Sequence, residues 1–144
     1  MQLADATLRP LLRDDTKTAW TITRIEYDPP EIPGDASLLP RAFIQLNNVP
    51  TARHKGGAGF GESQAIHTYR ITGQFAWPTT GTLEEAKVTK SNLLLAVLTT
   101  VSTVYRSNWR YLDPTIEFET GQTDNGEAFY TVTVEFPIEV IVTA

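Results

Sequence analysis

The 144-residue sequence contains no cysteine, no long apolar run and no motif that states a chemistry. Without cysteine, a disulfide scaffold, a zinc site with thiolate ligands and a cysteine nucleophile are excluded. The longest apolar run, Leu93–Leu98, is far shorter than the roughly 20 residues that cross a bilayer. No basic start followed by an apolar stretch opens the chain. We therefore expect no secretory signal, no membrane contact and synthesis in the cytoplasm.

Positive charge is absent from the last part of the chain. The whole sequence has 12 Lys and Arg against 17 Asp and Glu, a formal net charge of −5. Residues 41–110 hold eight bases and three acids, whereas residues 111–144 hold seven acids and no base. Such charge bears on solubility and association, not on fold. Two interpretations stay open: a solvated surface without a partner, or an acidic face of one subunit that meets a basic face of the next.

Two helices are expected from the spacing of apolar residues. The pattern over 3–13 predicts a short N-terminal amphipathic helix, with Pro10 either breaking it or lying in the first turn of a second piece. Thr82 and Glu85 fit a capping box, in which a hydroxyl and a carboxylate satisfy amides at a helix start. Apolar residues at helical spacing after them predict one long helix that ends near Tyr105.

Strands are expected where Thr, Ile, Val and aromatic residues gather. The predicted strands cover 18–27, 42–49, 65–77, 115–120 and 128–142. Alternation along 65–77 places His67, Tyr69, Ile71, Gly73, Phe75 and Trp77 on one inward face. Asp124-Asn125-Gly126 predicts a hairpin turn between the last two strands, since Asn and Gly tolerate positive φ. Pro137 has no amide hydrogen, which predicts a sheet edge or a bulge there.

The order of these elements predicts one α+β domain. Strands joined mainly as hairpins favour an antiparallel sheet, and one long helix on one face completes a two-layer sandwich. A proline-rich segment, 28–40, predicts a loop or extended arm, and a glycine-rich segment near 50–64 predicts a mobile loop.

The glycine-rich segment fits neither the P-loop nor the dinucleotide-binding fingerprint, and it precedes a strand. It is either a surface loop or a segment that becomes ordered when it binds a partner. Its candidate subunit or partner contacts are Arg53, His54, Lys55, Phe60 and Glu62. The strand acids Glu117, Glu119, Glu135 and Glu139 are predicted to face outward, toward a lumen or a neighbour.

Enzymatic chemistry has little support. His54 and His67 lack metal-ligand spacing, so we expect no metal and no cofactor, and His67 as a partly buried strand residue. The acidic pairs fit helix ends or solvated faces better than a general acid and base. Residues 105–111 combine aromatic and basic side chains, but the net negative charge argues against nucleic-acid binding, and a helix C-terminal turn is preferred.

The arrangement as a whole resembles the tail terminator (tail completion) proteins of long-tailed bacteriophages and the related neck proteins. The resemblance is carried by 42–50, the glycine-rich segment, strand 66–77, helix 82–105 and hairpin 115–142. It is a resemblance of organisation rather than of a diagnostic motif. The proline-rich segment departs from the pattern of that family and leaves the strand order around it open.

The resemblance implies a structural protein of the virion, not an enzyme. Such proteins form a hexameric ring on the end of the tail tube, stop its polymerisation and join it to the head connector, and DNA passes through without specific binding. The implied partners are further copies of the chain, the tail tube protein and the head connector or neck protein. The implied location is the tail end or neck, assembled in the bacterial host cytoplasm. Two alternatives stay open: another neck, connector or tube protein of the particle, or a small α+β ligand-binding or enzymatic domain.

Overall fold

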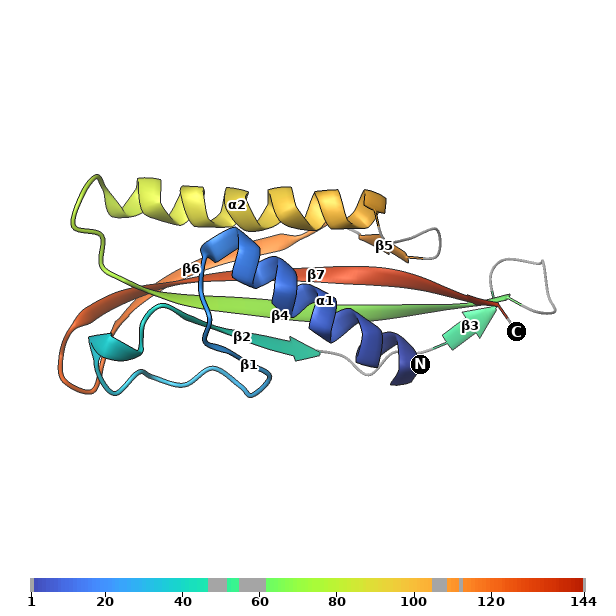
Figure 1. The fold of residues 1–144 in the computed structure, drawn as a ribbon, viewed down its shortest axis with the longest axis horizontal. Helices are drawn as coiled ribbons and strands as arrows, with labels where there is room; N and C mark the ends of the chain where they lie inside the picture. Colours follow the sequence, from blue (N-terminus) through green and yellow to red (C-terminus); the bar gives the residue numbers. More distant parts are fainter. Residues whose placement is uncertain (1, 47–51, 55–61, 105–108, 112, 144) are drawn as a thin grey trace.

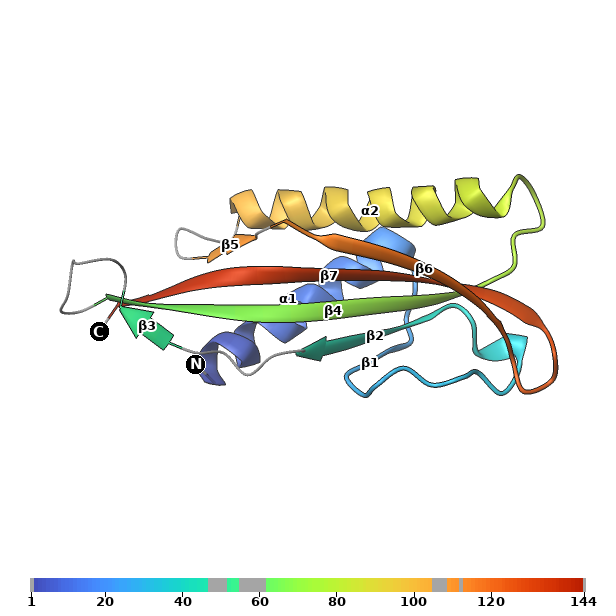
Figure 2. The ribbon, with the colours of Figure 1, turned by 180° about the vertical axis from the view of Figure 1, so that it is seen from behind.

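The computed structural model describes residues 2–46, 52–54, 62–104, 109–111 and 113–143. In chain order the elements are α1 (Gln2–Trp20), β1 (Ile25–Glu26), a 3₁₀ turn (Ala36–Leu38), β2 (Arg41–Leu46), β3 (Ala52–His54), β4 (Glu62–Ala76), α2 (Leu83–Val104), β5 (Trp109–Tyr111), β6 (Thr115–Gln122) and β7 (Ala128–Thr143). Within this part of the chain, seven strands form one sheet and both α-helices lie on the same face of it (Figures 1 and 2). The predicted α+β class is confirmed.

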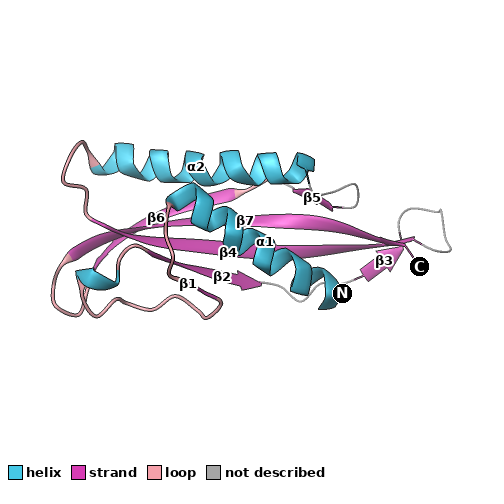
Figure 3. Ribbon diagram, in the orientation of Figure 1, coloured by secondary structure: helices cyan, strands magenta, loops and turns pink. Residues whose placement is uncertain are grey.

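The sheet is built on two long central strands (Figure 3). β4 and β7 are antiparallel and pair along the whole length of β4. β2 and β3 pair with the other side of β4, and β6 and β5 pair with the other side of β7. Among the described strands, only the two-residue β1 breaks the antiparallel pattern, because it is parallel to β2. The predicted last hairpin is therefore β6–β7, joined through Thr123, whose N–H donates to the Glu127 carbonyl at 2.8 Å.

The main core lies between the helices and the facing side of β4 and β7. Tyr69 and Ile71 of β4 are fully buried there, and Phe75 is 4% exposed. Their cross-strand partners on β7 are Phe136, Val134 and Tyr130. Period-two alternation predicted this face correctly as far as Phe75, but Trp77 is 43% exposed because β4 ends at Ala76.

The prediction of a strand over 18–27 is largely wrong. Helix α1 continues to Trp20, and only Ile25 and Glu26 form a strand. The threonines that favoured a strand are accommodated inside the helix, since the Thr16 hydroxyl donates to the Leu12 carbonyl at 2.7 Å. Thr18 does the same to Asp14 at 3.0 Å. The helix then stops at Thr21, whose φ of 53° is a left-handed conformation.

Tertiary packing of Trp20 explains why the helix is longer than predicted. The indole N–H donates to the Lys90 carbonyl of α2 at 2.8 Å, and the ring meets Phe75 edge-on at 5.1 Å between centroids. Gly73 makes this approach possible, because a Cβ there would lie 2.6 Å from the Trp20 ring. A contact between distant residues thus overrides local strand propensity.

Helix α2 begins where the sequence predicts. The Thr82 hydroxyl accepts the Glu85 N–H at 3.2 Å, which is one half of the expected capping box. Lys90, on the sheet side of this helix, lies 4.8 Å above the Phe75 ring, and burial lowers the pKa of its amine. In the described part of the chain, neither helix is long and apolar enough to cross a membrane.

Two further predictions are corrected at β7. Pro137 does not lie at an edge, because β7 has β4 on one side and β5 and β6 on the other. Its partner on β4 is Thr68, and on the other side it falls between Glu135, the last residue paired with β6, and Ile138, the first paired with β5. A break in the flanking strands accommodates the proline. Trp109–Tyr111 is strand β5, not a helix C-terminal turn.

Candidate interaction surface on the open face of the sheet

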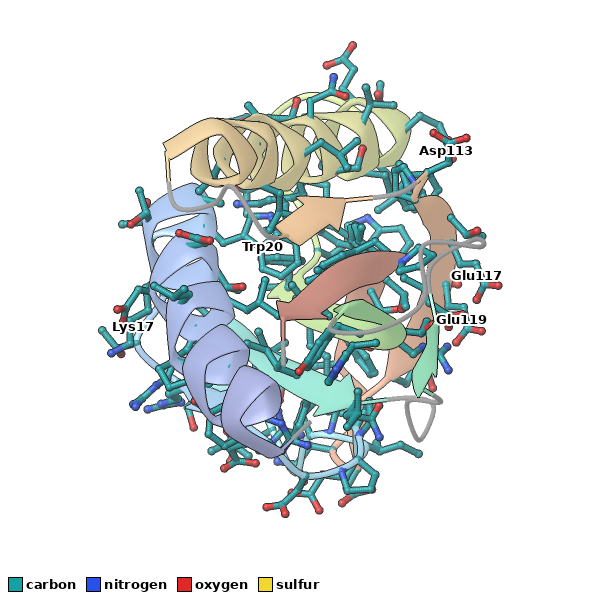
Figure 4. The ribbon with its side chains drawn as sticks, turned by 90° about the vertical axis from the view of Figure 1, so that its right-hand side faces the viewer. Lys17, Trp20, Asp113, Glu117 and Glu119 are labelled. Carbon is teal, nitrogen blue, oxygen red and sulfur yellow. The ribbon has the colours of Figure 1, made fainter. Side chains whose placement is uncertain are left out.

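The face of the sheet turned away from the helices carries polar side chains. It is called the open face here and consists of the alternate residues Thr68, Arg70, Thr72 and Gln74 of β4, Thr131, Thr133 and Glu135 of β7, and Glu117 and Glu119 of β6. Glu117 and Glu119 are exposed, and Figure 4 shows both at the side of the molecule opposite Lys17 of α1. Their predicted outward position is found in the structure.

Arg70 brings a positive charge among these acids. Its Nη2 atom lies 3.7 Å from a Glu117 carboxylate oxygen, and its strand position is directly opposite Glu135. Its Nε atom is buried and has no hydrogen-bond partner in the described part of the chain. The acidic hairpin is therefore partly neutralised within the same subunit, which sequence reasoning missed. Alternation along 65–77 leaves Arg70 on the face opposite the inward residues, and that signal could have found the pair.

A pocket of about 320 Å³ opens on this face. Its lining includes Glu119 and the side chains of Thr72 and Thr133, whose hydroxyls are 3.5 Å apart. Pro30 and Ile32 of the proline-rich segment form an apolar part of the wall, and Ile32 is 63% exposed. The pocket thus combines hydroxyl groups and a carboxylate with apolar surface, a lining suited to a polar side chain or small molecule.

The proline-rich segment is fastened across one end of the open face. Arg41 is 7% exposed, and its Nε donates to Gln74 Oε1 at 2.7 Å. Both Arg41 Nη2 and Gln74 Nε2 donate to the Glu31 carbonyl, at 2.9 and 2.8 Å. The Glu31 carboxylate adds an ion pair to Arg41 at 3.7 Å. The predicted loop or arm is therefore part of the pocket wall, held by buried side chains of β2 and β4.

The proline-rich segment is also attached to the turn between β6 and β7, next to the 3₁₀ turn Ala36–Leu38. Asp35 caps the 3₁₀ turn, accepting hydrogen bonds from the Ser37 N–H at 2.8 Å and from the Ser37 hydroxyl. These bonds, with a smaller contribution from the Arg24 charge, lower the pKa of the Asp35 carboxyl. Asp124 of the turn donates its N–H to the Pro33 carbonyl at 3.0 Å.

The predicted contacts of the glycine-rich segment fall partly outside the described residues. Lys55 and Phe60 lie there. The backbone of Arg53 and His54 forms β3, which pairs with Gln64 and Ser63 of β4, and Glu62 begins β4. The ends of the predicted loop are thus an antiparallel strand pair. Glu139, the fourth predicted acid, pairs through its strand position with Ile66 and Arg110.

The structure also locates His67, which the sequence analysis considered as a metal ligand. His67 is fully buried on the helix side of β4, stacked with Tyr69 at 6.2 Å between ring centroids, so it is more buried than predicted. Within the described residues no three His, Asp or Glu side chains gather in a way that could hold a metal ion. What the open face offers is charge, hydroxyl groups and the outer edge of β6, which pairs with no other strand among the described residues.

No protein-family model matches this sequence, and no curated protein matches it.

Proposed function

We propose that this chain is a structural virion assembly protein that forms a hexameric ring on the end of a phage tail tube. The ring ends tube polymerisation, joins the tube to the head connector and lets DNA pass without binding it specifically. Its location is the tail end or neck, and it performs no catalysis. Its partners are further copies of the chain, the tail tube protein and the head connector or neck protein.

The observation that carries the proposal is the arrangement of the elements. An N-terminal helix, a mainly antiparallel sheet, a long helix on one face and a closing hairpin occur in the order of the family that the sequence resembles. β6 pairs only with β7 in the described part of the chain, so its other edge is free. A free edge of eight residues invites association with another chain.

Ring formation requires two different surfaces on each subunit, because head-to-tail contacts are heterologous. The acids of β6 belong to one such surface in this proposal. The glycine-rich segment contributes to a subunit or partner contact through Arg53, His54, Lys55, Phe60 and Glu62.

The test is to measure assembly of the purified protein, alone and with tail tubes from the same particle. Light scattering should give the mass of six subunits, and electron micrographs should show rings on one end of each tube. Replacing 55–61 by a short turn should leave the thermal transition unchanged but reduce binding to the tube or the ring. A protein that stays monomeric at every concentration and does not bind tail tubes would contradict the proposal. Rings that bind a connector but no tube would favour a neck or connector protein.

The pocket on the open face favours one alternative, a small ligand-binding domain. The polar lining from Thr72, Thr133, Arg70 and Glu119 converges on one space. In that case a monomer should gain thermal stability from a small polar ligand, which a screen of amino acids, sugars and nucleotides would detect as a rise in Tm.

A further inference from the structure

Glu117 and Glu119 form a pair of like charges that the chain itself balances only in part, through Arg70. They are two residues apart on edge strand β6 and point to the same face. Glu119 makes no ion pair or hydrogen bond in the described part of the chain, and its strand partner is Thr131. Glu117 has Arg70 at 3.7 Å, yet its own side chain remains 59% exposed. Both carboxylates can therefore accept a further cation.

Arg13 and Lys17 form a second pair of like charges, with the opposite sign. They are four residues apart on α1, which places them on the same side of the helix. Neither makes an ion pair or a hydrogen bond in the portion of the chain that is described. Like charges at this spacing destabilise a helix. Lys17 gains some compensation from the last turn of the helix, and the exposed Asp14 lies next to Arg13 and three residues before Lys17, but in the described part of the chain it forms no ion pair with either.

The two pairs match in spacing and lie on opposite sides of the subunit. Four residues of helix span about 6 Å, and two residues of strand span about 6.8 Å. Figure 4 looks along the molecule and shows Lys17 on the outer side of α1, with Glu117 and Glu119 at the far side of the sheet. Two complementary surfaces on opposite sides are what a head-to-tail contact requires.

We infer that the pair Glu117 and Glu119 of one subunit docks onto the pair Arg13 and Lys17 of a second copy of this chain. The inference rests on the proposed ring and names the contact that closes it. It places the β6 acids at a subunit boundary rather than on a DNA-facing lumen. It also identifies the basic surface as α1, not the basic middle of the sequence that the charge distribution favours.

The free edge of β6 supports the same partner. Covering an edge strand with a helix is one way in which proteins prevent uncontrolled strand pairing. A neighbouring α1 laid along β6 would cover this edge while its Arg13 and Lys17 reach the two carboxylates. Phe118, between the two acids, is 38% exposed and has Lys87 of α2 at 5.8 Å from its ring. The edge is therefore amphipathic, with charge on one side and an aromatic ring on the other.

Charge reversal on either side tests the contact. We expect the full-length variants Glu117→Lys/Glu119→Lys and Arg13→Glu/Lys17→Glu to remain folded, because three of the four side chains are exposed and Lys17 is only half-buried. The β6 variant should have a slightly lower Tm than wild type, since it loses the ion pair between Glu117 and Arg70. Each should raise the dissociation constant of the oligomer at least tenfold, because like charges then face each other. The control Glu84→Lys/Asp124→Lys changes the net charge as much as the β6 variant at two other exposed acids, and should assemble as wild type.

Mixing the two reversed variants is the decisive measurement. The β6 of each then complements the α1 of the other, so an equimolar mixture should form rings of alternating subunits, detected by light scattering and native mass spectrometry. If both reversed variants still form rings as the wild type does, this contact is overturned and the proposed ring stands. Reversed variants that fail to assemble even when mixed would show that the acids and bases serve different contacts. A wild type that never assembles, alone or on tubes, would overturn the ring and this contact together.

Discussion

The two faces of the sheet use the same strands for different purposes. On the helix side, Tyr69, Ile71 and Val132 are fully buried among apolar neighbours. On the open face, Thr72 and Gln74 are also buried, as is Arg41 of β2, the strand partner of Gln74, but each of the three carries a hydrogen-bonding side chain. Burial is therefore not what separates the faces. The helix side is stabilised by close apolar packing. On the open face, hydrogen bonds between polar side chains and the proline-rich segment hold that segment in place as part of the pocket wall.

The largest effect should come from breaking the helix side at Trp20. Trp20→Ala removes the contact with Phe75 and the hydrogen bond to the Lys90 carbonyl, and leaves a cavity above Gly73. We expect the free energy of unfolding to fall by about 3–5 kcal/mol, measured by denaturant titration. Trp77→Ala is the matched control, because this tryptophan is 43% exposed, and it should cost about 1 kcal/mol or less. Equal losses for the two variants would contradict the described core.

A smaller effect should follow from breaking the open face at Arg41. Arg41→Met keeps the apolar stem but removes the donor to the buried Gln74 Oε1, which is left unpaired, while the Glu31 carbonyl keeps only its bond from Gln74 Nε2. We expect a loss of about 2–3 kcal/mol, together with faster proteolysis within the proline-rich segment.

Arg24→Met provides the comparison, since Arg24 also donates to this segment, to the Ser37 carbonyl at 2.7 Å, but from an exposed position. It should cost less than about 1 kcal/mol. If Arg24→Met proved the more damaging substitution, the segment would be held by its exposed attachment and not by the buried one.

The helix side was the more predictable of the two faces. Alternation along β4 and the Thr82 cap depend on neighbouring residues, so the sequence alone assigned both correctly. The strand expected around Trp20 failed because its helix is stabilised by a contact with Lys90, 70 residues away. On the open face, alternation placed Glu117 and Glu119 outward. The ion pair of Glu117 with Arg70, and the attachment of Glu31 to Arg41, arise only when β2, β4 and β6 come together.

The smallest effect should appear at Asp35 and should depend on pH. The folded-state pKa of this carboxyl is lowered, chiefly by the Ser37 hydrogen bonds, so its contribution to stability is present above its ordinary pKa of 3.8 and is lost as the pH falls through the lower folded value. Asp35→Asn should therefore lower Tm slightly at pH 7, with the difference from wild type shrinking below about pH 4. Asp28→Asn, an exposed acid of the same segment, controls for the change in net charge. A difference that grows on acidification would mean that the carboxylate is destabilising in the folded chain, and that the 3₁₀ turn does not help to hold the segment against the open face.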